Sequence, residues 1–194
     1  MNTSLYLFPL PVLDEPPPAQ QVEAVLRQCG FLGDSLGEGR YRVGGNFFGH
    51  ITFAGCSPHL KLEPAEEGDV DFTHLRLREE SRPRLRVAPQ RGRPRCQGCG
   101  AAVPGWKERL PQWQEDATSR WRCAECGSEM RVAELDWRQY GVAARLLVEV
   151  RQVWPGEALP GDALLRQLES GTGRSWSYAW AESFWALPLI EWVV

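Results

Sequence analysis

The hydrophobic positions of the chain form two similar series, one near each end. Each series begins with a short apolar run, residues 4–12 or 142–153, that predicts a strand. A proline-containing loop follows each run. Apolar residues at spacings of three and four then predict a short helix over residues 22–29 or 163–170, and a glycine-rich turn closes the series. The pattern predicts an α+β fold, with two short βα units in a mixed sheet.

Shorter patterns predict the remaining elements. Alternation within residues 142–153 indicates a strand buried on one face, with a helix as the alternative. Six glycines among polar and aromatic residues indicate loops and a hairpin over residues 33–49. Further strands are expected over residues 50–54, 59–63, 72–78, 176–180 and 184–194, the last at a sheet edge because Pro188 lacks an N–H.

Two CxxCG motifs lie near the middle of the chain, CQGCG at residues 96–100 and CAECG at residues 123–127. A CxxC turn places two thiolates on one tight loop, and the glycine after the second cysteine suits a residue with positive φ. Four thiolates suit a tetrahedral zinc ion. The sequence therefore predicts one zinc ion held by Cys96, Cys99, Cys123 and Cys126.

On these motifs, residues 93–131 resemble the zinc-ribbon, or rubredoxin-like, family. The resemblance implies a small ribbon with one structural zinc ion, because four cysteine ligands leave no open position for catalysis. Iron in a rubredoxin-like redox site and a disulfide pair are the alternatives. The segment between Cys99 and Cys123 is longer than the ~15–20 residues usual for this pattern. We expect the excess, residues 104–119, to be an extended loop that holds Trp106 and Trp113.

The ribbon divides the chain into three expected parts. Residues 1–92 form an N-terminal α+β part that ends in an arginine-rich connector, and residues 93–131 form the ribbon. Residues 132–194 form a C-terminal α+β part that packs with the first. An inserted zinc ribbon with four cysteine ligands thus separates the two βα units.

Charge is distributed unevenly along a chain whose net charge is −3. Arginines gather on the proline-containing segment that enters the ribbon: Arg82, Arg84, Arg86, Arg91, Arg93 and Arg95. Arginines for phosphates, followed by tryptophans that stack on bases, are typical of a single-strand nucleic-acid binder. An acidic protein partner is another possible ligand. We expect instead a solvated connector that pairs with the preceding acidic residues, Glu66, Glu67, Asp69 and Asp71.

Three further residues carry chemistry, Cys56 with His50 and His59. A cysteine–histidine pair can form a nucleophile, and the three side chains together can begin a second metal site. The sequence around them has no paired orienting acid, so ordinary structural roles are expected. Cys29 lies on the apolar face of the first helix and is expected to be a small buried side chain.

Composition limits the classes of function. The chain begins without a basic start or long apolar run, and no segment approaches the ~20 apolar residues of a membrane span. With six cysteines and no secretory signal, we expect reduced thiols and a cytoplasmic location, and the excess of arginine over lysine indicates a GC-rich bacterial genome. The favoured function is a non-enzymatic zinc-binding protein that acts as a protein–protein interaction or adaptor module, with an inhibitor or immunity role as one form. Nucleic-acid binding through residues 82–95 and the ribbon is the alternative, followed by a thiol-dependent enzyme that uses Cys56.

Overall fold

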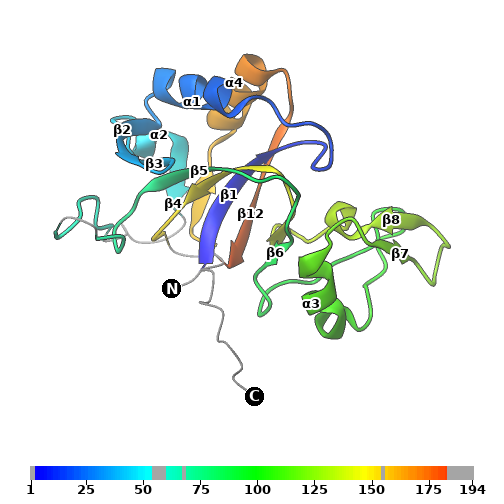
Figure 1. Cartoon of the computed structure of the whole chain (residues 1–194). Coiled ribbons are helices and arrows are strands. Elements are labelled where there is room, and N and C mark those ends of the chain that lie inside the picture. The colour runs from blue at the N-terminus through cyan, green and yellow to red at the C-terminus, as the bar shows by residue number, and fades with distance from the viewer. Residues whose placement is uncertain (1–2, 54–59, 67–68, 154–155, 183–194) are drawn as a thin grey trace.

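A six-stranded sheet forms the centre of the larger part of the molecule (Figure 1). The structure, a computed structural model, describes residues 3–53, 60–66, 69–153 and 156–182. The strand order is β12-β1-β10-β5-β3-β2, and each neighbouring pair is antiparallel. The strands are β1 (Thr3–Pro9), β2 (Leu32–Gly37), β3 (Arg40–Val43), β5 (Leu75–Glu79), β10 (Leu146–Val150) and β12 (Trp176–Glu182).

The two expected βα units are present and interleave. The first begins with β1 and α1 (Ala19–Gln28), and the second consists of β10, α4 (Asp162–Thr172) and β12. Strand β10 lies between β1 and β5, and β1 lies between β10 and β12, so parallel strands are never neighbours. This is the split-βαβ arrangement, in which a strand of one unit separates the strands of the other. The α+β class is confirmed, and the interleaving explains why neighbours in the sheet are antiparallel rather than mixed.

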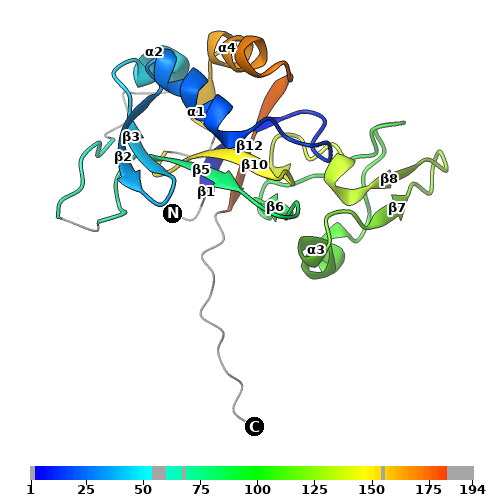
Figure 2. The ribbon, with the colours of Figure 1, turned by 45° about the horizontal axis from the view of Figure 1, so that its top comes forward.

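Helices α1 and α4 cover the same face of the sheet (Figure 2). The apolar periodicity explains this placement, because α1 buries Val22 and Leu26 while α4 buries Leu164 and Leu168 against the sheet. The helices approach closely at Gly171. A Cβ there would overlap Cγ2 of Val25, so this contact requires a glycine.

The other face of the sheet is partly buried as well. Tyr6 and Phe8 of β1 and Leu147 of β10 pack in a separate cluster with Val142 and Ala144. All five residues of β10 are buried. The expectation that this strand would be buried on one face only is therefore wrong, because the small lobe packs beside the second face.

The small lobe has its own apolar core, drawn from residues 85–143. Its elements lie beside the large sheet in Figure 1. They are β6 (Arg86–Val87), α3 (Trp106–Glu115), β7 (Arg120–Arg122), β8 (Glu129–Arg131), a 3₁₀ turn (Val132–Glu134) and β9 (Gly141–Val142). The core extends beyond residues 93–131 on both sides, so the strands that lead into and out of the ribbon belong to the same packed unit.

The segment expected to be an extended loop, residues 104–119, contains helix α3. Trp106, Leu110 and Trp113 are spaced by four and three residues, so one helix face carries all three. Trp106 and Trp113 both pack edge-on against Trp137, with ring centroids 5.8 and 6.4 Å apart. The loop prediction was therefore wrong, because this periodicity forms a helix that accommodates Pro111 within it.

Smaller elements complete the larger part. The short helix α2 (Phe47–His50) precedes β4 (Ile51–Phe53), which pairs with β11 (Ala158–Pro160) outside the main sheet. No strand forms over residues 60–63, contrary to expectation, and the predicted strand over residues 184–194 lies outside the described residues. Within the described ranges, no helix combines the length and the apolar character that crossing a membrane requires.

Candidate metal centre and the basic surface beside it

The four motif cysteines lie together at one end of the small lobe. The sulfur atoms of Cys96, Cys99, Cys123 and Cys126 all lie within 4.8 Å of one another. The Sγ atoms of Cys96 and Cys126 are 3.7 Å apart, as are those of Cys99 and Cys123. The cluster can hold a metal ion, and it is compatible with a site of the zinc-ribbon kind.

The two CxxCG turns have matching backbone geometry. Gly100 donates its N–H to the carbonyl of Cys96 at 2.8 Å, and Gly127 donates to the carbonyl of Cys123 at 3.0 Å. Both glycines have positive φ, 73° and 72°, which side chains rarely adopt. The glycine that follows each CxxC pair therefore allows the chain to leave the turn in the same way on both sides of the site.

The second turn is the loop of a hairpin, because it joins β7 to β8 directly. The first turn is closed by a hydrogen bond from the Cys96 N–H to the carbonyl of Ala101, at 2.8 Å. Cys96 and Cys123 are buried in the core of the lobe, whereas Cys99 and Cys126 are exposed. A bound ion would thus join the lobe's surface turns to its apolar core.

Ser128 contributes to the electrostatics of the site. Its Oγ lies 3.2 Å from Sγ of Cys126, and hydrogen bonds from the hydroxyl and the backbone of Ser128 lower the pKa of Cys126 to about 6. A lowered pKa favours the thiolate, which is the form that binds metal ions. Sequence reasoning did not single out Ser128, although its position directly after the second CxxCG motif was a usable signal.

The arginines of the arginine-rich segment differ in burial and in partners, so the segment is not a uniformly solvated connector. Arg86 is buried in β6, forms an ion pair with Glu80 and lies over the ring of Tyr6. Its partner therefore lies immediately before the arginine run, rather than in the earlier acidic segment. Arg82 and Arg84 are exposed.

The acidic residues expected to neutralise the run have other partners. Asp69 accepts a hydrogen bond from Nζ of Lys61 at 2.7 Å, and Asp71 accepts one from Nε2 of Gln152 at 2.7 Å. Glu67 lies outside the described residues. In the described part of the chain, the expected pairing of the arginine run with these carboxylates is not found.

Three arginines of the run line one hollow beside the metal centre. Arg91, Arg93 and Arg95 are exposed, and they alternate with buried residues between them. Together with Arg138 they line a hollow of about 570 Å³, whose remaining walls are Asp136, Gln139 and Tyr140. Sequence reasoning missed Arg138, because only the fold brings residues 136–140 beside residues 91–95.

Backbone contacts hold these two segments together. The N–H of Arg95 donates to the carbonyl of Asp136 at 2.8 Å, and the N–H of Asp136 donates back to the carbonyl of Arg95 at 3.0 Å. Arg138 and Gln139 have φ values of 53° and 64°, which is uncommon for two consecutive residues other than glycine. The side chain of Asp136 supports this turn by accepting the N–H of Arg138 at 2.9 Å.

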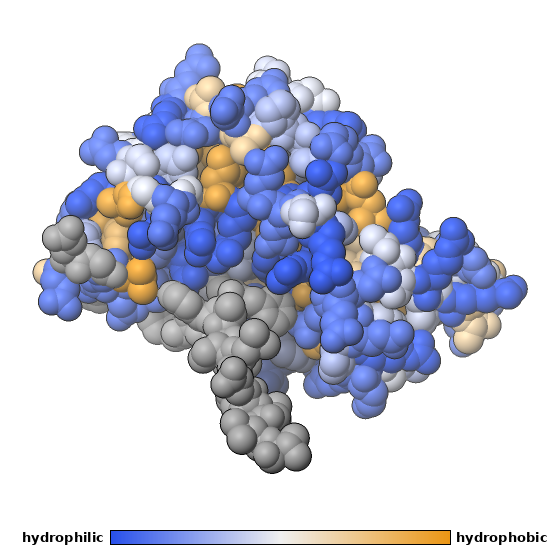
Figure 3. Space-filling model, viewed as in Figure 1, coloured by the Kyte–Doolittle hydropathy of each residue, from blue (hydrophilic) through white to orange (hydrophobic). Residues whose placement is uncertain are grey.

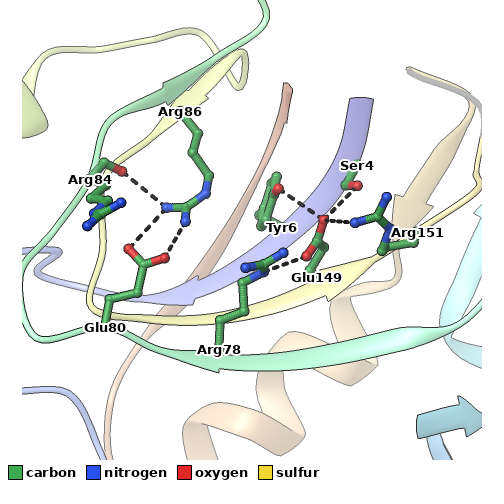
Figure 4. Close-up of polar contacts among 8 residues, drawn as sticks. All are labelled: Ser4, Tyr6, Arg78, Glu80, Arg84, Arg86, Glu149 and Arg151. Atoms are coloured by element: carbon green, nitrogen blue, oxygen red, sulfur yellow. Dashed lines mark hydrogen bonds and ion pairs between the residues drawn. The ribbon is translucent and has the colours of Figure 1, made fainter. Parts of the chain in front are cut away.

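A second polar cluster lies on the sheet face opposite the helices (Figure 4). Glu149 is fully buried there, and it accepts hydrogen bonds from the hydroxyls of Ser4 and Tyr6 at 3.0 and 3.1 Å. Arg78 binds its other carboxylate oxygen at 2.6 Å, and Arg151 approaches within 3.6 Å. Because Tyr6 and Glu149 are cross-strand partners of β1 and β10, the sheet register itself forms this cluster.

Only one of the three residues of the expected thiol site, His50, lies within the described residues. Cys56 and His59 lie outside the described residues. His50 is buried, and its Nε2 donates to the carbonyl of Cys29 at 2.9 Å. Cys29 is half-buried at the end of α1, and burial raises the pKa of its thiol. The contacts of His50 and Cys29 are therefore those of residues that support the fold.

Comparison with known proteins does not assign the chain to a family. No family model matches the chain, and neither the curated proteins nor the solved structures include a significant match to it.

Proposed function

We propose that the protein is a non-enzymatic zinc-binding protein, and that its small lobe is a module for interaction with another protein. The observation that carries this proposal is the cluster of four cysteine sulfur atoms within 4.8 Å of one another, built into a lobe with its own core. The lobe stands to the side of the large sheet, and its surface is largely hydrophilic in the view of Figure 3.

The cysteine geometry supports the proposal of a tetrahedral zinc ion. Four sulfur atoms placed ~2.3 Å from a central zinc ion in a tetrahedron lie ~3.8 Å from one another. The two 3.7 Å sulfur pairs agree with this spacing, whereas a disulfide needs a separation of ~2.05 Å. When bound, the ion supplies structural cross-linking alone, because four protein ligands leave no position for water or substrate.

The four cysteines have separate parts in holding the ion. Cys96 and Cys123 connect it to the buried side of the lobe, and Cys99 and Cys126 complete the site on the exposed side. This division supports a role in which the metal centre stiffens a surface rather than one in which it transforms a substrate.

The second candidate, nucleic-acid binding, rests on the basic hollow near the metal centre. It also needs aromatic side chains on which bases can stack. The lobe's tryptophans do not supply them, because Trp106, Trp113, Trp121 and Trp137 are all buried in its core. The exposed chemistry of the lobe is thus charged and lacks exposed tryptophan in its described part, which favours a protein partner.

Isolation of the native complex tests the proposed function. A tagged full-length chain, purified at physiological salt with nuclease present, is expected to carry one protein partner in a fixed stoichiometry measured by native mass spectrometry. The Cys99→Ser variant should lose that partner, whereas Cys29→Ser should retain it. A chain that carries no protein, or whose partner is unaffected by loss of Cys99, contradicts the proposal.

A further inference from the structure

The geometry of the basic hollow points to the partner's chemistry. We propose that Arg91, Arg93, Arg95 and Arg138 form the docking site for an acidic segment of the partner protein. This inference rests on the proposed function, and it assigns the interaction to one surface of the small lobe.

The spacing of the arginines suits an extended ligand. Arg93 and Arg95 are exposed at alternate positions with buried Pro94 between them, so their side chains leave the backbone on the same side, ~6.6–6.8 Å apart along it, and Arg91 lies in the turn that precedes them. Carboxylates at alternate positions of an extended peptide have the same period. Arg138 adds a fourth cation from the opposite wall of the hollow.

Acidic side chains neutralise little of the positive charge that lines the hollow. Asp136 is the only carboxylate among the described residues that line the hollow, so the lining carries four arginines and one acid. The Asp136 side chain already accepts the backbone N–H of Arg138. Among the described residues, no ion pair is found for Arg93, Arg95 or Arg138, so their charge is available to a ligand.

Contacts with the protein position the guanidinium groups without occupying them fully. Nη1 of Arg95 donates to the carbonyl of Gly100 at 2.9 Å, and Nη1 of Arg93 donates to the carbonyl of Gly92 at 2.6 Å. Arg91 stacks over the ring of Tyr140, with its Cζ 5.9 Å from the ring centroid. A guanidinium has five N–H donors in a planar fork that matches a carboxylate, so Arg93 and Arg95 retain donors for bidentate pairing.

An acidic protein segment fits this site better than a nucleic acid does. Both ligands are anionic, but single-strand binders also stack bases on aromatic rings. Tyr140 is the only aromatic residue among the described residues that line the hollow, and Arg91 lies over its ring.

The docking site should depend on the metal centre. Arg95 immediately precedes Cys96, and its side chain binds the carbonyl of Gly100 in the first CxxCG turn. Residues 91–95 are held against residues 136–138 through the backbone pair of Arg95 and Asp136. Loss of the ion therefore removes the support of one wall of the hollow.

Binding of two simple anions tests the inference. Fluorescence anisotropy should be measured for a labelled deca-glutamate peptide and for an oligothymidylate of equal charge, in increasing salt. We expect the full-length protein to bind the peptide more tightly, with affinity that falls as salt rises. The double variant Arg93→Glu/Arg138→Glu should weaken peptide binding by at least about tenfold, since two attractive pairs become repulsive.

A matched charge reversal controls for net charge. Arg109→Glu/Arg166→Glu changes two exposed arginines on α3 and α4 and should leave peptide affinity within about twofold. Retained zinc content shows that each variant is folded. Equal losses in both double variants, tighter binding of oligothymidylate, or no peptide binding would overturn the inference. Isolation of the native partner distinguishes the two proposals. If the wild-type chain and Arg93→Glu/Arg138→Glu both retain the partner, this docking site is wrong while the proposed function stands. If the wild-type chain carries no partner, the proposed function fails.

Discussion

Replacing Cys99 by serine is expected to unfold the small lobe while the six-stranded sheet stays folded. Cys99 is exposed and outside the lobe's apolar core, so the substitution removes a metal ligand and little packing. Zinc binding to small domains contributes about 10–16 kcal/mol near neutral pH, more than a lobe of this size gains from its core alone. The main sheet has a separate core, which the metal does not touch.

Hydrogen exchange measures this result region by region. In Cys99→Ser, amides of β7, β8 and α3 should lose protection, whereas those of β1 and β10 should keep it. Cys29→Ser is the control, because it removes a thiol from the larger part. Loss of protection across both parts would contradict the account and would mean that the sheet depends on the lobe.

Replacing Glu149 by alanine is expected to destabilise the larger part by about 3–5 kcal/mol, the usual cost of removing one partner from a buried ion pair. The side chain of Glu149 is fully buried, and those of Arg78 and Arg151 are only 18% and 8% exposed. Removal of the carboxylate takes away the negative charge that both cations face. It also leaves the hydroxyls of Ser4 and Tyr6 without this acceptor.

Urea unfolding followed by circular dichroism measures the loss of free energy. Glu15→Ala is the matched control, because Glu15 pairs with Arg145 in the same part but is 77% exposed. Exposed pairs contribute about 0–1 kcal/mol, so the control should change stability by no more than that. A loss below about 1 kcal/mol for Glu149→Ala would show that the cluster is not a stabilising feature.

The sequence predicted the elements whose periodicity is regular. Helices α1 and α4 and strands β1, β10 and β12 follow from apolar spacing, because each contributes a consistent set of buried positions. Helix α3 was not predicted, although Trp106, Leu110 and Trp113 have helical spacing, and it contains Pro111, which is unfavourable inside a helix. The interleaved strand order could not be derived, because local periodicity carries no information about which strands become neighbours.

The candidate site likewise has one part that the sequence predicted and others that it did not. The cysteine cluster was predictable, because the CxxCG turns bring ligands together locally and only one long-range pairing is required. The basic hollow was not, because Arg138 reaches residues 91–95 through tertiary contacts alone. Glu149 was also missed as a polar centre, since its partners come from β1 and β5, which only the fold brings beside β10.

Metal analysis of the purified protein tests the central claim most directly. Elemental mass spectrometry of the full-length chain, prepared under reducing conditions, is expected to give one zinc ion per chain. Cys99→Ser should abolish the zinc, and Cys29→Ser and Cys56→Ala should retain it. Iron in place of zinc, absence of any metal from the wild-type chain, or release of zinc by Cys56→Ala would contradict the assignment of one zinc ion to Cys96, Cys99, Cys123 and Cys126.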